Sequence, residues 1–522
     1  MKKANPLVLT DFYKTIHHLA YTPGLEYLVS YWTPRMSRYD YIDKVVVFGM
    51  QAFIKEYLIT YFNENFFEKD REEMLSEYKR LISNTMTQQA ADTTEIEKLY
   101  DLGYLPIQIK AVAEGTRVNI KTPVYEISNT VKGYGWLVNY LETFISVNIW
   151  HPMNSASVAY AYRQIVNKYF DKTVSEKAVT RIDFENGKML SKESNAVLAN
   201  VKSAACGDSM RGMTSIEDAL KSSSAHLLSF TGSATIGAIL WLEEFYNCDC
   251  TKEVVGKGVP STEHSVMSSY GRDGEEECYR HLIEDVFTAG PLSIVSDTYD
   301  YWNVVTKIIP SLKESIMKRD GKIIIRGDSG DPVEIICGTV TELEEGKEYT
   351  PEELGTVRCL WNVFGGYIND KGYKVLDSHI GAIYGDAITY ERAGKIYELL
   401  EKMGFAVSNV TLGIGSYTYQ YVTRDSLGQA LKATNSIVDG KERQIFKDPV
   451  TDKVKGANFK KSQKGMCCVY RDGEDVLYKD ELTFDMVKDM KENLLVPVFC
   501  DGKLLVDESL SDIRARLHGG EF

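Results

Sequence analysis

The sequence lacks any long run of apolar residues. No uninterrupted apolar stretch reaches the roughly 18 residues that a helix needs to cross a bilayer. The opening residues, MKKANP, are polar, so the chain begins without the apolar core of a secretory signal peptide. We therefore expect no membrane-spanning segment and a cytoplasmic protein.

Cysteine pairs with metal-binding spacing are also missing. The sequence has 9 cysteines, an odd number, and none of them belongs to a Cys-x-x-Cys motif. The close pairs Cys248/Cys250 and Cys467/Cys468 have no matching partners of the kind that complete a zinc site. We expect reduced, mostly structural thiols.

Positive charge is in short supply. The chain carries 60 Lys and Arg residues against 74 Asp and Glu residues, which gives a net charge of −14. A field of this sign repels phosphate, so the composition disfavours non-specific binding to nucleic acid. An anionic ligand would have to be bound by lysines and arginines that are gathered locally.

The length and the sequence pattern indicate more than one domain. At 522 residues the chain is long enough for two or three domains. Residues 1–160 mix helical and strand patterns, residues 161–425 alternate apolar strands with helices, and residues 426–522 contain short strands and basic loops. Alternating strands and helices indicate right-handed βαβ units. We therefore predict an α/β protein with a barrel-like parallel α/β catalytic domain plus an α+β domain built from both chain ends.

Two patterns in the first region make local predictions. Gly115–Ser128 alternates between apolar and polar residues like one strand. Trp136–Trp150 has the composition of a largely buried helix. Both elements would belong to the α+β domain.

The stretch Lys322–Pro332, KIIIRGDSGDP, combines a strand with polar groups at its end. Its three consecutive isoleucines predict a strand buried on both faces. The apolar run stops at Arg326, and Asp328 and a Ser-Gly turn follow. Proteins of the α/β class usually build anion and sugar-phosphate sites at such strand ends. A salt-bridged strand end without a ligand is the alternative.

Three more apolar runs end in a similar way. Ser293–Asp297, Ala382–Asp386 and Val410–Ser416 each finish in small or acidic residues. Because the carboxyl ends of parallel strands meet at one edge of a sheet, these strand ends predict one shared site.

Further candidates lie outside these strands. His264 occupies a loop of small polar residues, where Asp297 and Asp328 could orient its ring; the alternative is a bystander beside a helix cap. Gly413–Ser416 is typical of a phosphate cradle but also of an ordinary turn. The local cations that an acidic protein needs for a polyphosphate, unless they only form a solvated basic face, are Arg424, Lys432, Lys447 and Lys455.

Taken together, these residues resemble the nicotinamide phosphoribosyltransferases, the type II enzymes that join nicotinamide to phosphoribosyl pyrophosphate (PRPP). The resemblance extends over nearly the whole chain, although each motif alone is short. The matching motifs are TDxYK at 10–14, Tyr31 with Arg35, WLxNxxET at 136–143, MRG at 210–212, SAHL at 224–227, VPxxEHS at 259–265, SxVSDxYD at 293–300, IRxDSGxP at 325–332, GD at 385–386, GxG at 413–415, TRD at 423–425 and FKDP at 446–449.

The resemblance implies a reaction and its partners. Members of the family make nicotinamide mononucleotide (NMN) and pyrophosphate in NAD salvage, use Mg²⁺, and couple ATP hydrolysis to synthesis through a phosphorylated histidine. They act as homodimers whose sites contain residues of both subunits. Nicotinamide, PRPP and ATP would be the small-molecule partners, with no nucleic acid and no membrane.

The resemblance also implies roles for individual residues. His264 is similar to the phosphorylated histidine, with Glu263, Asp297 and Asp328 beside it. The other assignments are Arg211 and Arg326 at the ring and the ribosyl phosphate, Ser293 near the histidine and the base, Gly385, Asp386, Gly415 and Ser416 at the ribose and 5′-phosphate, Arg35, Arg424, Lys432, Lys447 and Lys455 at the pyrophosphate, and Asp11 and Tyr13 from the second subunit.

Two positions depart from the pattern of the family. Asp208 stands where the family has an aromatic residue that stacks on the base, and Ala234 stands where it has the Asp that reads the carboxamide. Asp208 either reads the carboxamide itself or points elsewhere, so the base stays open between nicotinamide, nicotinate and another pyridine. A catalytically silent homologue that binds a nucleotide is the remaining alternative.

Overall fold

The computed structural model describes residues 4–175, 181–182, 189–190, 201–385, 387–450, 461–520 and 522. The chain divides into two compact units. Unit 1 contains Met1–Val158, Trp241–Asp249 and Val422–Gly520, and unit 2 contains Ala159–Leu240, Cys250–Tyr421 and Glu521–Phe522. The sequence-based boundaries near 160 and 425 lie within a few residues of two of these junctions. The inclusion of Trp241–Asp249 in unit 1 has no counterpart in the sequence-based division.

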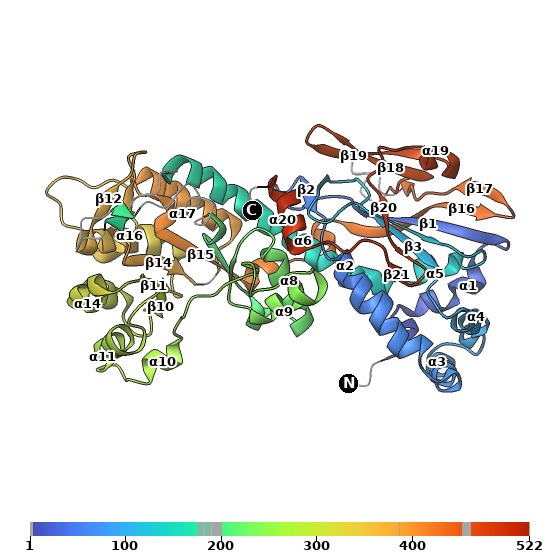
Figure 1. Cartoon of the computed structure of the whole chain (residues 1–522), viewed down its shortest axis with the longest axis horizontal. Helices are drawn as coiled ribbons and strands as arrows, with labels where there is room; N and C mark the ends of the chain where they lie inside the picture. Colours follow the sequence, from blue (N-terminus) through green and yellow to red (C-terminus); the bar gives the residue numbers. More distant parts are fainter. Residues whose placement is uncertain are drawn as a thin grey trace. The chain divides into compact units, whose positions relative to one another are not determined.

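Unit 1 is built on a seven-stranded sheet whose strands come from both ends of the chain (Figure 1). The strand order is β17-β16-β1-β5-β3-β20-β21, and neighbouring strands are antiparallel. Near the middle, Tyr31 of β1 lies opposite Lys432 of β16. The strands are β1 (Leu25–Pro34), β3 (Ile107–Ala111), β5 (Tyr125–Asn129), β16 (Gln429–Val438), β17 (Lys441–Gln444), β20 (Val496–Cys500) and β21 (Lys503–Leu504).

The strand predicted over 115–128 is wrong, because the chain turns within it. The structure has two strands here, β4 (Arg117–Asn119) and β5, and β4 pairs with β2 (Lys44–Val46) outside the main sheet. The turn between them contains Lys121, whose φ is 80°. Pro123, which follows, has no N–H for a continuous ladder.

Helices and two smaller hairpins complete unit 1. The helix predicted at Trp136–Trp150 is present but divided at Leu141 between α5 and α6. The helices are η1 (Pro6–Val8), η2 (Phe12–Ile16), α1 (His17–Ala20), α2 (Met50–Phe53), η3 (Ile54–Tyr61), η4 (Asn63–Phe67), α3 (Arg71–Thr85), η5 (Gln89–Ala91), α4 (Thr94–Leu102), α5 (Gly135–Tyr140), the first part of α6 (Glu142–Thr173), η10 (Arg424–Ser426), α19 (Phe484–Lys488) and α20 (Leu510–His518); β18 (Met466–Asp472) pairs with β19 (Asp475–Leu482).

Unit 2 contains the predicted parallel sheet. Its order is β10-β11-β14-β15-β8-β9, and each neighbouring pair is parallel. In β11, Ile323 and Ile325 are fully buried whereas Ile324 is only half-buried, so the two faces of this strand are not equally covered. The strands are β8 (Ala205–Asp208), β9 (Gly232–Ser233), β10 (Leu292–Val295), β11 (Ile323–Gly327), β14 (Ile380–Tyr384) and β15 (Val410–Gly415).

An irregular segment, residues 257–262, connects the two edges of this sheet. Lys257 pairs with Gly232 in β9, and Ser261 pairs with Ser293 in β10, both in parallel. The backbone hydrogen bonds include Ser233 N–H to Lys257 O at 3.0 Å and Thr262 N–H to Ser293 O at 3.0 Å. Because the segment bonds to both edge strands, the curled sheet forms a barrel-like layer.

Helices cover the unit 2 sheet on its outer side, as βαβ units require. Helices α15 and α16, for example, contact β14, and α16 is labelled beside β14 in Figure 1. The elements are the second part of α6, η6 (Met210–Gly212), α8 (Ile216–His226), the first part of α9 (Ile236–Phe245, which enters unit 1 at Trp241), α10 (His264–Ser268), α11 (Glu275–His281), η7 (Leu282–Val286), α12 (Tyr301–Asn303), η8 (Val304–Ile308), α13 (Ile309–Ser311), α14 (Lys313–Lys318), α15 (Pro332–Cys337), α16 (Pro351–Phe364), α17 (Tyr390–Lys402), η9 (Val407–Asn409) and α18 (Ser416–Gln420), with short pairs β6 (Arg181–Ile182) with β7 (Met189–Leu190) and β12 (Gly366–Ile368) with β13 (Lys374–Leu376).

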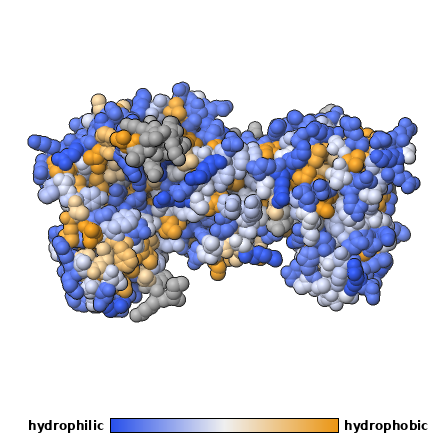
Figure 2. Space-filling view, turned by 180° about the vertical axis from the view of Figure 1, so that it is seen from behind, coloured by the Kyte–Doolittle hydropathy of each residue, from blue (hydrophilic) through white to orange (hydrophobic). Residues whose placement is uncertain are grey.

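The surface agrees with the acidic, charged composition. Hydrophilic residues cover most of the face shown in Figure 2, and smaller hydrophobic patches lie between them. Among the described helices, none combines the length with the apolarity that crossing a bilayer would take.

Candidate active site

Arg326 and Asp328 form a two-fold hydrogen-bonded contact where β11 ends. Arg326 donates from Nε to Asp328 Oδ1 over 3.0 Å and from Nη2 to Asp328 Oδ2 over 2.7 Å. The two side chains are only 20% and 18% exposed. A bidentate pair of this kind fixes the direction of both side chains. The salt-bridged strand end that the sequence allowed as an alternative is therefore present, and other polar side chains surround it.

Asp297, which follows β10, ties this strand end to the end of β11. Its Oδ2 accepts a hydrogen bond from the Asp328 N–H over 3.0 Å. The side chain is 6% exposed, and Oδ1 has no hydrogen-bond partner among the described residues. A buried carboxylate oxygen without a partner is costly, so a cation or a donor group at this atom would be stabilised.

His264 begins α10, directly after the closing segment, and its ring reaches the same strand ends. Nε2 lies 3.7 Å from Asp297 Oδ1 and 3.9 Å from Asp328 Oδ2. On the other side of the ring, Nδ1 lies 3.0 Å from Thr298 Oγ1. The structure thus brings His264, Asp297 and Asp328 together, as the strand-end pattern predicts.

These three residues could hold a metal ion. Their ligand atoms all lie within 4.8 Å of one another. Both oxygens of Asp328, however, already accept hydrogen bonds from the positively charged Arg326. Asp297 Oδ1 is therefore the oxygen of this group that is best able to bind a cation.

Glycines let the backbone approach these side chains closely. A Cβ on Gly385, which follows β14, would lie 2.1 Å from Asp328 Oδ1 and 2.6 Å from Arg326 Nε. A Cβ on Gly212 would lie 2.0 Å from Ser416 Oγ, so the turn after β8 packs against the residue that follows β15. The ends of β8, β11, β14 and β15 are in this way in mutual contact.

Asp208 and Ala234 lie at the ends of two strands that the sequence pattern did not predict. Asp208 is the last residue of β8, in register with Gly415, and Ala234 directly follows β9. Burial opposes the charged form of Arg326, but Asp328, Asp208 and Asp297 together raise the pKa of Arg326 above its usual value. Asp208 thus acts electrostatically on the same guanidinium, while Ala234 offers only a methyl group.

The remaining candidate residues of unit 2 make no hydrogen bond or ion pair with the Arg326–Asp328 pair within the part of the chain that the structure describes. Arg211 is exposed in η6, and Glu263 is exposed at the start of α10, where it accepts a hydrogen bond from the Ser265 hydroxyl. Ser293 is buried in the first half of β10, where its backbone pairs with the closing segment. This position supports the sheet and does not lie at its C-terminal edge.

Asp11 and Tyr13 lie together on the surface of unit 1. The Tyr13 hydroxyl donates to Asp11 Oδ2 over 3.1 Å, and the Thr143 hydroxyl donates to the same oxygen over 2.6 Å. Tyr13 and the adjacent Phe12 are 55% and 58% exposed. Two exposed aromatic side chains in succession leave apolar area that a partner could cover.

A cluster of positive charge surrounds Lys432 in unit 1. Glu142 accepts from Lys14 Nζ over 2.6 Å, and its other oxygen lies 3.3 Å from Lys432 Nζ. Burial lowers the pKa of Lys432, Glu142 opposes this shift, and the charges of Arg35 and Lys14 add to it. One carboxylate is thus shared by two lysines with an arginine nearby, which leaves an excess of positive charge for an anion.

Of the other predicted cations, the structure describes Arg424 and Lys447. Arg424 is exposed, and its Nη2 lies 3.6 Å from Asp425 Oδ1. Lys447 is exposed, and its backbone N–H donates to the Ser462 hydroxyl over 2.9 Å. Lys455 and Asp386 lie outside the described residues.

Sequence reasoning missed three residues that contact predicted ones. Thr298 occupies a variable position of the SxVSDxYD motif, so matching the motif gives it no weight. Lys14 and Glu142 lie inside the matched motifs TDxYK and WLxNxxET without an assigned role. The signal that could have found Thr298 is its position directly after Asp297, since neighbours of a site residue often support it.

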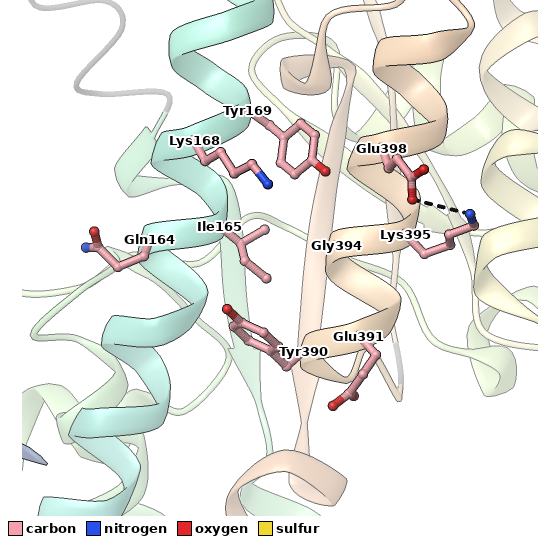
Figure 3. A pocket seen from close by; sticks show the side chains of 9 residues that line it. All are labelled: Gln164, Ile165, Lys168, Tyr169, Tyr390, Glu391, Gly394, Lys395 and Glu398. Atoms are coloured by element: carbon pink, nitrogen blue, oxygen red, sulfur yellow. Dashed lines mark hydrogen bonds and ion pairs between the residues drawn. The ribbon is translucent and has the colours of Figure 1, made fainter. Parts of the chain in front are cut away.

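A shallow groove on unit 2 contains no predicted site residue. It lies between α6 and α17 and has a volume of about 480 Å³ (Figure 3). Tyr169 and Tyr390 point toward it from the two helices, and Lys395 pairs with Glu398 at its side over 3.3 Å. Nothing in its lining gathers charge of one sign, unlike the strand-end site.

Comparisons with known proteins extend over the whole chain. A family model described as the nicotinate phosphoribosyltransferase (NAPRTase) family matches residues 207–499, and one described as the nicotinamide phosphoribosyltransferase N-terminal domain matches residues 5–109. A protein of Acinetobacter baylyi named nicotinamide phosphoribosyltransferase is 40% identical over 99% of this chain and 97% of its own length. A protein of Xanthomonas campestris with the same name is 29% identical over 98% of this chain and 97% of its own length.

Solved structures share the fold. Human nicotinic acid phosphoribosyltransferase superimposes with a TM-score of 0.54 at 14% identity, covering 98% of this chain and 93% of that one. Nicotinate-nucleotide pyrophosphorylase from Pyrococcus furiosus gives a TM-score of 0.54 at 12% identity, covering 99% and 95%. The predicted fold class is therefore confirmed.

The close packing of Gly385 generates a prediction. In Gly385→Ala, the new methyl group must displace the Arg326–Asp328 pair or the end of β14. Displacing reacting groups by about 1 Å commonly costs roughly 100-fold in rate, so we expect phosphoribosyl transfer, the reaction for which the relatives are named, to fall by about that factor.

The matched control is Gly394→Ala in α17, where a Cβ would meet only Ile165 Cδ1 at 3.8 Å. This change should leave the rate unaltered and stabilise the helix slightly. Equal kcat/KM in Gly385→Ala and the wild type would contradict the tight contact.

Proposed function

Because the chain belongs to the nicotinate phosphoribosyltransferase (NAPRTase) family and is 40% identical to a protein named nicotinamide phosphoribosyltransferase, the activity that its motifs predict, we propose that it joins nicotinamide to PRPP and releases NMN and pyrophosphate in NAD salvage. The observation that carries the proposal is the Arg326–Asp328 pair at the strand ends, with Asp297 and His264 beside it. Acidic groups and a planar cation at one edge of the sheet suit a reaction in which a sugar becomes positively charged between a base and a leaving anion.

The reaction needs positioning more than it needs a base. As pyrophosphate departs, the anomeric carbon of the ribose gains positive charge, which the carboxylates of Asp328 and Asp297 stabilise. The nucleophile is the neutral nitrogen of the pyridine ring, so no proton has to be removed. The two hydrogen bonds that Arg326 donates to Asp328 fix the orientation of its guanidinium, whose plane can then stack on the pyridine ring.

The leaving pyrophosphate requires positive charge. When Mg²⁺ is bound, it neutralises part of the charge that develops on this group. Asp297 Oδ1 fits such an ion, because it is a buried oxygen without a hydrogen-bond partner among the described residues. We assign the pyrophosphate to the cations that the resemblance implies, which are Arg35, Arg424, Lys432, Lys447 and Lys455. The excess of positive charge around Glu142 supports this assignment.

His264 is the residue through which we propose that ATP drives the reaction. Its ring is 49% exposed, so a phosphoryl donor could reach it, and two carboxylates lie within 4 Å of Nε2. A phosphorylated His264 would add negative charge beside Asp297 and Asp328, which favours binding of Mg²⁺ and discharge of the phosphoryl group on turnover.

The active species is proposed to be a homodimer with shared sites. The segment that carries Asp11 and Tyr13 also exposes Leu9, Phe12 and Leu19, by 39%, 58% and 45%. A second copy would cover this apolar face and receive Tyr13 as part of its own site. The other partners are proposed to be small molecules. We propose a cytoplasmic location, where thiols stay reduced, because Cys206, Cys278, Cys337, Cys359, Cys467, Cys468 and Cys500 carry free thiols.

Asp208 is expected to set the preference of the base site for nicotinamide over nicotinate. It lies at the end of β8 and acts on Arg326, the residue proposed to stack on the ring. A carboxylate there accepts a hydrogen bond from the amide of nicotinamide and repels the carboxylate of nicotinate. Ala234 cannot supply this contact, so Asp208 would carry the discrimination alone.

The first test compares bases. The wild type should form NMN from nicotinamide and PRPP with Mg²⁺, and prefer nicotinamide over nicotinate by roughly 5- to 150-fold in kcat/KM, the value of an unpaired polar partner in a desolvated pocket. Asp208→Asn should erode the preference by improving nicotinate, whereas Asp273→Asn, an exposed Asp of unit 2, should not. No NMN with saturating PRPP would overturn the function, and an intact preference in Asp208→Asn would exclude Asp208 as the reader.

The second test concerns ATP. His264→Ala should lose ATP hydrolysis and the stimulation of synthesis by ATP, while basal transfer survives in part because the cations and carboxylates remain. His281→Ala removes an exposed histidine of α11 that pairs with Asp285 over 3.0 Å and serves as the control. An acid-labile phosphate that persists in His264→Ala would count against this role.

The third test mixes subunits. Tyr13→Ala and Arg326→Ala should each be nearly inactive as homodimers, since each lacks one half of the shared site. After exchange, heterodimers contain one intact site, so activity should return toward about a quarter of the wild type under random pairing. Exchange demonstrated by mass without any return of activity would show that the sites are not shared.

A further inference from the structure

One loop faces both nitrogens of the His264 ring. Asp297 and Thr298 are consecutive residues after β10. Thr298 Oγ1 lies 3.0 Å from Nδ1, while Asp297 Oδ1 lies 3.7 Å from Nε2. The same short segment therefore places a neutral hydroxyl at one nitrogen and a carboxylate near the other.

Packing alone does not hold the ring in this orientation. The side chain of His264 is 49% exposed, and α10, which it begins, contains only 5 residues. A half-exposed imidazole can turn over about its last side-chain bond at little cost. Among the described residues, the contact with Thr298 is the one hydrogen bond of the ring, so it decides which nitrogen points to the carboxylates.

The nitrogen that faces the carboxylates keeps its lone pair free. At 3.7 Å and 3.9 Å, neither Asp297 nor Asp328 is within hydrogen-bonding distance of Nε2. The charge of Asp328 is offset by Arg326, and Asp297 Oδ2 already accepts the Asp328 N–H. The Thr298 hydroxyl is thus within hydrogen-bonding distance of the ring, whereas the two carboxylates are not.

A neutral imidazole carries one proton, and its hydrogen bonds determine which nitrogen bears it. Thr298 Oγ1 can accept the proton of Nδ1–H. This arrangement leaves the lone pair on Nε2, in the direction of the acidic groups where a Mg²⁺-bound phosphate would be held. A nucleophile needs such a free lone pair aimed at the reacting phosphorus.

We propose that Thr298 is a positioning residue that keeps the proton on Nδ1 of His264 and so makes Nε2 the nitrogen that accepts the phosphoryl group. The inference rests on the proposed coupling to ATP. In this step the Nε2 lone pair forms a bond to the γ-phosphorus of ATP, and the bond from that phosphorus to the β,γ-bridging oxygen breaks. The electron pair of that bond leaves with ADP, and the proton stays on Nδ1, donated to Thr298 Oγ1.

The first experiment locates the proton without any substrate. Nitrogen NMR of the full chain with labelled histidine, with the His264 signal assigned by its loss in His264→Asn, should show a protonated Nδ1 and an unprotonated Nε2. Thr298→Val, which keeps the shape but removes the hydroxyl, should shift the proton toward Nε2, and Thr298→Ser should restore the wild-type signals. A proton on Nε2 in the wild type, or an unchanged spectrum in Thr298→Val, would overturn the proposal.

The second experiment identifies the phosphorylated nitrogen. After reaction with ATP, phosphorus NMR should show the Nε2 isomer of phosphohistidine in the wild type and in Thr298→Ser. Loss of one hydrogen bond to the reacting group predicts phosphorylation roughly tenfold slower in Thr298→Val. Thr306→Val removes a hydroxyl that donates to Trp302 O over 2.6 Å in η8, away from His264, and is the control for the substitution itself.

The outcomes separate this inference from the coupling to ATP. An Nδ1 isomer in the wild type would refute the role of Thr298 while leaving a phosphorylated His264 intact. If no phosphohistidine forms in any variant, the coupling and the acceptor role both fall, and the NMR signals still decide where the proton lies. If Thr298→Val and Thr306→Val melt at the same temperature as the wild type, misfolding is excluded as the cause of a slower reaction.

Discussion

The hydrogen-bonded pair of Arg326 and Asp328 is the contact on which the rest of the strand-end site depends. Strand β11 lies between β10 and β14, so the pair stands between the loop that contacts His264 and the backbone at Gly385. Removing two charges from water is costly, and the two parallel hydrogen bonds offset that cost only if the geometry is held. Asp297 holds it through the Asp328 N–H, and the lack of a side chain at Gly385 leaves room for it.

This arrangement also explains why Asp297 has a free oxygen. One oxygen accepts the hydrogen bond from the Asp328 N–H, and the other is buried without a hydrogen-bond partner among the described residues. Such an atom is costly in a purely structural ion pair, and this cost supports the proposed binding of an ion or a ligand at Asp297. The alternative of a mere salt-bridged strand end accounts for Arg326 and Asp328 but not for this oxygen.

Positive charge is gathered locally around Lys432, although the chain as a whole is acidic. The net charge is −14, yet Lys14 and Lys432 share the single carboxylate of Glu142, with Arg35 close enough to lower the pKa of Lys432. An anion bound there would be attracted locally while the overall field keeps other polyanions away. The lack of positive charge in the composition is thus compatible with a phosphate substrate, because binding depends on the nearest groups.

By itself, the sequence determined the strands β10, β11, β14 and β15 and the polar residues at their ends, because hydrophobic runs and the residues that stop them are local properties. It also determined family membership, since ordered motifs survive over the whole chain. Only the tertiary structure decided that β8 and β9, with 4 and 2 residues too short for a periodic signal, continue the sheet and carry Asp208 and Ala234 to its edge. Only the tertiary structure, too, brought Thr298 to His264 and Lys14 to Glu142. These contacts join residues that are 34 and 128 positions apart, and the path of the backbone between them depends on packing that no local pattern records.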